Sequence, residues 1–110
     1  MLTIFDQATP VPIRLYLEQH TVRTAAQQGW DKLGNGDLLT AAEEAGFDIL
    51  LTTDKNIRYQ QNLAGRKIAI VVLGHQQWPQ LEPHIQRVID AVNAAKPCSY
   101  VEVDIPLKSI

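Results

Sequence analysis

Two short apolar runs, with no polar residue inside them, constrain the fold of this chain most. They are residues 49–51, Ile-Leu-Leu, and residues 68–73, Ile-Ala-Ile-Val-Val-Leu. A strand with one face in water alternates apolar and polar side chains, whereas a strand covered on both faces is apolar throughout. Strands of the second kind are typical of parallel sheets with helices packed on both faces. We therefore expect both runs to be central parallel strands.

The rest of the chain alternates strand and helix patterns. Residues 2–5 and 21–24 carry β-forming residues, and residues 99–105 alternate in polarity as a half-exposed edge strand does. Helix signals occur at residues 13–19, 37–45, 57–63 and 83–95. This order predicts an α/β fold with an open, mostly parallel sheet flanked by helices on both faces. An α+β fold with a partly antiparallel sheet is the alternative.

Length and composition narrow the class of protein. A chain of 110 residues fits one domain over residues 1–110. A formal net charge of −2 supplies no overall field that attracts nucleic acid or anionic membranes, so an RNA site would depend on a local basic patch. Cys98 is the only cysteine, which excludes an intrachain disulfide and a cysteine-based metal cage and indicates a reducing compartment. With no signal-peptide pattern and no apolar run near the roughly 20 residues of a membrane span, we expect a cytoplasmic protein without a membrane partner.

Two aspartates follow the predicted strands directly. Asp6 ends the first strand, Asp54 ends the strand expected over residues 47–53, and Gly74 with His75 ends the run at 68–73. Because the carboxyl ends of parallel strands meet at one edge, we expect Asp6 and Asp54 to share a site there. Carboxylates at close range repel each other unless a cation joins them, and Mg²⁺ or Mn²⁺ is the natural choice for oxygen ligands. The alternative is that each aspartate only caps the turn after its strand.

Two further groups are weaker candidates. Asp37 opens a predicted helix, where it is either a third carboxylate of the site or a first-turn residue that the helix dipole favours. Glu44 lies on the same helix and more naturally faces solvent. His75 is either an acid–base group or an ordinary surface histidine.

The segment after Asp54 is rich in polar and basic residues. Lys55 and Arg58 can bind phosphates, and Tyr59 can stack on an unpaired base, which together suggest an RNA-binding loop. A solvated loop without a ligand would have the same composition. Trp30 and Trp78 are interpreted as packing anchors rather than as platforms for a base.

Three segments together resemble a known family. Residues 2–10 (Leu-Thr-Ile-Phe-Asp-Gln-Ala-Thr-Pro), 35–43 (Asn-Gly-Asp-Leu-Leu-Thr-Ala-Ala-Glu) and 49–56 (Ile-Leu-Leu-Thr-Thr-Asp-Lys-Asn) resemble the small bacterial PIN-like proteins of the DUF5615 type. The similarity extends over most of residues 2–74. It implies a PIN-like fold and a ribonuclease dependent on Mg²⁺ or Mn²⁺. Because many PIN-like proteins are toxins of toxin–antitoxin pairs, it also implies an antitoxin-like partner.

The resemblance assigns the site residue by residue. Asp6, Asp37 and Asp54 match the family's acidic positions and would be the catalytic metal ligands. Gln7 stands where the family usually has glutamate, and Asn56 where it usually has a second aspartate. These neutral amides lower the charge of the site and should weaken divalent cation binding.

The nuclease interpretation gives roles to two more residues after Asp54, and it has a rival. Asn56 would orient the attacking water, and Arg58 would hold the scissile phosphate. The rival is a catalytically weakened PIN-like module that binds RNA or a protein partner. A nucleotide-binding regulator is the least favoured reading, because the sequence has no glycine-rich phosphate loop. Whether the chain forms a homo-oligomer is left open.

Overall fold

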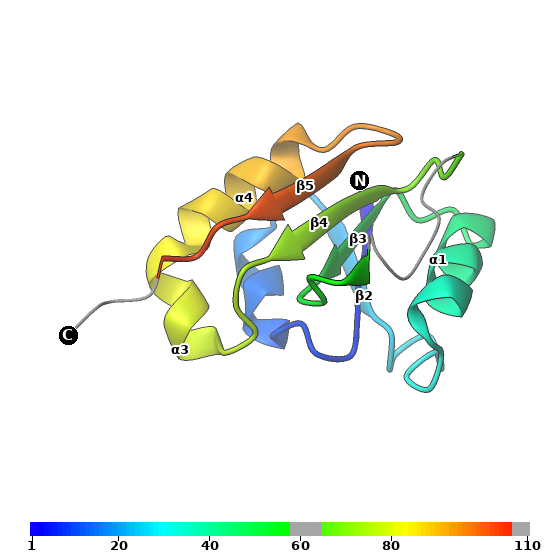
Figure 1. Ribbon diagram of the computed structural model, residues 1–110, viewed down its shortest axis with the longest axis horizontal. Coiled ribbons are helices and arrows are strands. Elements are labelled where there is room, and N and C mark those ends of the chain that lie inside the picture. Colours follow the sequence, from blue (N-terminus) through cyan, green and yellow to red (C-terminus); the bar gives the residue numbers. More distant parts are fainter. Residues whose placement is uncertain (58–64, 107–110) are drawn as a thin grey trace.

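A five-stranded parallel sheet forms the centre of the computed structural model, which describes residues 1–57 and 65–106 (Figure 1). Every neighbouring pair of strands is parallel, and their order is β2-β1-β3-β4-β5. The predicted α/β fold is confirmed, and the partly antiparallel alternative is wrong. The strands are β1 (Leu2–Phe5), β2 (Thr21–Thr24), β3 (Ile49–Thr52), β4 (Ala69–Leu73) and β5 (Tyr100–Val103).

The apolar runs behave as their composition predicts. All residues of β3 and β4 are buried, and both strands lie inside the sheet with neighbours on each side. The half-exposed β5 lies at the edge, as predicted, although it ends at Val103 rather than at residue 105. Burying a leucine or isoleucine side chain contributes roughly 1.5–3 kcal/mol, so these two strands supply much of the core.

The helices differ from the prediction at their ends. The first is a 3-10 helix, η1 (Val11–Tyr16), rather than a helix over residues 13–19. The next, α1 (Asn35–Glu44), begins two residues before the predicted start because Gly34 takes the N-cap position, and Gly46 follows it with φ +85°. Of the helix expected over residues 57–63, all but the first residue lies outside the described part.

The helix expected over residues 83–95 is observed as the 3-10 turn η2 (Glu82–His84) followed by α4 (Ile85–Ala94). A short helix that was not predicted, α3 (Trp78–Leu81), comes directly before them. Pro83 explains the interruption, because proline has no backbone N–H to continue an α-helical ladder. None of the helices in the described ranges is long and apolar enough to cross a membrane.

Helices cover both faces of the sheet. Phe5, Leu51 and Val71 point to one face, where they pack with η1, α3 and α4. Ile4 and Leu50 point to the other, where α1 covers them. Figure 1 shows α1 on one side of the strands and α3 with α4 on the opposite side.

The strand order reverses at β1. The chain first adds β2 on one side of β1 and then returns to add β3 on the other side. In open α/β sheets, a crevice forms at the carboxyl ends of the strands where the order reverses, and ligands bind there. The carboxyl ends of β1 and β3 are therefore the first place to look for a site.

Candidate functional site

Asp6 and Asp54 lie at this reversal point. The backbone N–H of Asp6 donates to the Leu51 carbonyl at 3.2 Å, which extends the pairing of β1 with β3 by one residue. Since Phe5 is paired with Leu51, Asp6 stands opposite Thr52. Side chains alternate along a strand, so Asp6 and Thr52 point to the face covered by α1, as Ile4 and Leu50 do.

Asp6 is held by two threonines. Its Oδ1 accepts hydrogen bonds from the backbone N–H of Thr9 at 3.0 Å and from the Thr9 hydroxyl, and its Oδ2 accepts from the Thr52 hydroxyl. Both threonines are buried. The Asp6 carboxylate is therefore fixed in orientation by three donors.

Asp54 is held by its own turn and by α1. Its Oδ1 accepts from the backbone N–H of Asn56 at 2.9 Å, and its Oδ2 accepts from the side-chain amide of Asn35 at 2.6 Å. The first contact is the turn-capping role that sequence reasoning offered as the alternative. The second ties the same carboxylate to the first turn of α1, across the crevice from Asp6.

Thr52 joins the two aspartates. Its hydroxyl donates to Asp6 and accepts the backbone N–H of Asp54 at 3.1 Å. Sequence reasoning did not single out Thr52, Thr9 or Asn35 as supporting residues. A threonine at the end of an otherwise apolar strand was the available signal, because a buried hydroxyl needs a partner.

An open cleft of about 490 Å³ lies between these elements. Asp6 and Asp54 both line it, so the structure brings these two residues together at the strand ends, while their role as ligands of one metal site stays a prediction. The other polar residues that line it are Thr53, the exposed Asp31 and Lys55, and four amide residues, and no histidine or cysteine of the described ranges does so. Oxygen donors of this kind suit a hard divalent cation such as Mg²⁺ or Mn²⁺. Within residues 1–57 and 65–106, no group of three or more His, Cys, Asp or Glu side chains is placed to hold a metal ion.

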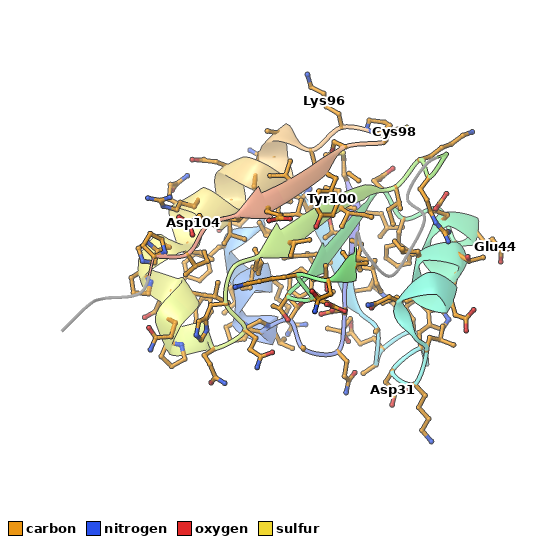
Figure 2. The ribbon with its side chains drawn as sticks, viewed as in Figure 1. Asp31, Glu44, Lys96, Cys98, Tyr100 and Asp104 are labelled. Carbon is orange, nitrogen blue, oxygen red and sulfur yellow. The ribbon has the colours of Figure 1, made fainter. Side chains whose placement is uncertain are left out.

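Asp37 is exposed and does not line this cleft. Helix α1 begins at Asn35, which lines the cleft, and two residues along an α-helix turn by about 200°. Asp37 therefore leaves the helix on the side opposite to Asn35. Its role as a third ligand stays a prediction that the geometry does not favour. Glu44 is also exposed, and Figure 2 shows it at the outer side of α1, away from the sheet.

Of the residues predicted to bind RNA or position water, two are described. Lys55 and Asn56 are exposed and line the cleft. Arg58 and Tyr59 lie outside the described residues. Gln7, the other position with an amide in place of an acid, is exposed and lines the cleft as well.

A second polar hollow of about 460 Å³ adjoins the cleft. The two share Thr53, Lys55 and Gln76, and the hollow continues to His75 and Gln77 after β4. His75 is half-buried, and its Nδ1 accepts the backbone N–H of Gln77 at 3.0 Å. Together the cleft and the hollow make a polar trough along the carboxyl ends of β1, β3 and β4.

Comparison with known proteins yields no relative: no family model, no curated protein and no solved structure matches this chain. The α/β fold and the strand order follow from the structure alone. Function has to be inferred from the residues around the trough.

Proposed function

We propose that this chain is a metal-dependent ribonuclease of the PIN-like type that acts at the cleft between β1 and β3. The observation that carries the proposal is the position of Asp6 and Asp54, which line one cleft at the reversal of strand order and share the Thr52 hydroxyl. Because many PIN-like proteins are toxins of toxin–antitoxin pairs, an antitoxin-like protein is the partner that the proposal suggests.

Asp6 and Asp54 would hold the cation. A carboxylate offers about four lone-pair positions, of which Asp6 uses three and Asp54 uses two in the contacts described above. Asp6 therefore keeps capacity for one more partner and Asp54 for two. A divalent cation bound there would activate water and neutralise charge on a phosphodiester.

The surrounding residues suit a nucleic-acid strand. Lys55 stands where the cleft meets the second hollow, so its ammonium group can pair with a phosphate that passes between them. Asn56 lines the cleft next to Asp54 and can orient a water molecule by its amide. A trough that runs past three strand ends fits a polymer better than a small, enclosed metabolite.

A catalytically weakened module that binds RNA or a protein is the second candidate. Two observations favour it: Asp37 lies outside the cleft, and Gln7 and Asn56 bring amides rather than carboxylates to it. Fewer charged ligands lower the affinity for a divalent cation. Binding without cleavage would then be the activity that remains.

The test compares three aspartate-to-asparagine variants. Cleavage of single-stranded RNA should require Mn²⁺ or Mg²⁺, disappear with a chelator, and be lost in Asp6→Asn and Asp54→Asn. Asp37→Asn is the matched control, because it removes an equal charge outside the cleft, and it should keep both cleavage and cation binding. Calorimetry with Mn²⁺ separates the candidates: a wild-type protein that binds RNA but no cation would support the module and contradict the nuclease.

A further inference from the structure

Four apolar side chains also line the cleft and we call them its apolar wall, although the exposed Asp31 between Trp30 and Leu33 lines the cleft as well. The wall consists of Ala25, Trp30, Leu33 and Leu38. Ala25 and Leu38 are buried core residues, whereas Trp30 is half-buried and Leu33 is 38% exposed. Packing in the core does not explain why Trp30 and Leu33, which line a polar cleft, are left partly exposed.

Trp30 is held firmly in this wall. Its ring makes a T-shaped contact with Phe47, with centroids 5.9 Å apart and planes at 70°. The prediction that Trp30 is a packing anchor therefore holds for its contact with Phe47, while part of the side chain remains exposed in the cleft wall. An aromatic ring that is fixed by one contact and open elsewhere loses little entropy when a second ring stacks on it.

The backbone links this wall to the aspartates. The Phe5 carbonyl accepts the N–H of Ala25 at 2.8 Å, and the Ala25 carbonyl accepts the N–H of Trp30 at 2.8 Å. The N–H of Leu33 then donates to the Trp30 carbonyl at 3.0 Å. Phe5 is the residue before Asp6, so two hydrogen bonds fix the position of Trp30 relative to the carboxylate end of the cleft.

We propose that Trp30 and Leu33 form a nucleobase-binding wall, on which one base of single-stranded RNA stacks while the adjoining phosphate lies at Asp6 and Asp54. The identity of the ligand as RNA rests on the proposed function. A volume of about 490 Å³ lies within the range of pockets that hold nucleotide-sized ligands, roughly 300–1,000 Å³. Single strands are the suitable class, because a base in a duplex is already stacked between its neighbours.

The two tryptophans of the chain make a direct test possible. Trp78 packs against Tyr16 and against the core cluster on the opposite face of the sheet from α1, so it serves as a matched control. In Trp78→Phe, all tryptophan fluorescence comes from Trp30, which is left unchanged. We expect a single-stranded oligouridylate of ten nucleotides, added with Ca²⁺, to quench this fluorescence, and the same oligonucleotide in a duplex to quench it far less.

Affinity measurements complete the test. Stacking of one base on an aromatic ring corresponds to roughly a 5- to 150-fold change in affinity, so Trp30→Leu should weaken binding of the labelled single strand by that factor. Leu33→Ala should weaken it less, and Trp78→Leu should leave it unchanged. Unquenched Trp30 fluorescence at saturating RNA would overturn the proposal, as would equal affinities of Trp30→Leu and wild type. Either result leaves the nuclease function standing if Asp6→Asn still abolishes cleavage; quenching without any cleavage would support the wall and contradict the nuclease.

Discussion

Thr52→Val tests the link between the two aspartates. Valine keeps the shape of threonine but removes the hydroxyl that donates to Asp6 and accepts the Asp54 N–H. Thr52 is 0% exposed, so no water takes the place of the hydroxyl directly. A hydrogen bond to a charged group contributes about 1.5–3 kcal/mol and a neutral one about 1 kcal/mol.

The expected loss is smaller than the sum of these two contributions. Asp6 is half-buried and regains part of its hydrogen bonding from water, so we expect the free energy of unfolding to fall by about 2 kcal/mol. For a domain of this size, such a loss lowers Tm by roughly 8–16 °C. Urea unfolding and a thermal scan measure both quantities, and a scan with Mn²⁺ should show a smaller metal-dependent gain in Tm than wild type shows.

Thr3→Val is the matched control. Thr3 is also a strand threonine with 0% exposure, but its hydroxyl has only a contact at 3.5 Å with the Met1 carbonyl. That distance is at the limit of a hydrogen bond, so the control should change stability by no more than about 0.5 kcal/mol. Equal losses in the two variants would refute the reasoning, because they would show that the aspartate contacts of Thr52 add nothing.

Three further predictions concern the core and the charge of the site. In native-state hydrogen exchange, the amides of β3 and β4 should exchange most slowly, and rapid exchange there would contradict their assignment as the central strands. Gly74→Ala should lower the free energy of unfolding by about 1–3 kcal/mol in urea, because the added Cβ would lie 2.9 Å from two backbone atoms near the end of β5. Gly34→Ala is the control: a Cβ there has no neighbour within 4 Å, so the free energy of unfolding should fall far less. Gln7→Glu with Asn56→Asp should enlarge the Mn²⁺-dependent gain in Tm, and an unchanged gain would place both positions outside any metal site.

The fold was predictable because its strongest signals are local. The runs at 49–51 and 68–73 are apolar throughout, and a parallel sheet covered on both faces is the arrangement that buries them. The ends of the strands could also be predicted from the sequence, so Asp6 and Asp54 were correctly expected at the same edge of the sheet. Strand order was not predicted, since pairing between distant segments leaves no mark in a single sequence.

The parts of the site that escaped prediction depend on helix phase. Placing the start of α1 at residue 37 rather than at Asn35 makes Asp37 its opening residue. With the observed start, Asn35 and Leu38 line the cleft and Asp37 does not, because of the rotation of about 100° per residue. The first turn of α1 thus brings the amide of Asn35 to Asp54, whereas the carboxylate of Asp37 lies outside the cleft. Helix ends are the least certain feature of a sequence, since Gly34 offers no side chain that signals the N-cap.

The amides Gln7 and Asn56, where the proposed PIN-like site would have acids, affect the charge of the cleft rather than its shape. Asn56 bonds to Asp54 through its backbone N–H, and its side chain is exposed in the cleft, so an aspartate at this position would keep the same turn. Gln7 is likewise exposed, and the contacts that fix Asp6 come from Thr9 and Thr52 instead. Five donor contacts hold the two carboxylates, and none of them comes from the side chain of Gln7 or Asn56. Restoring acids at the two amide positions should therefore act on cation affinity, and any loss of stability without the cation should come from carboxylate repulsion alone.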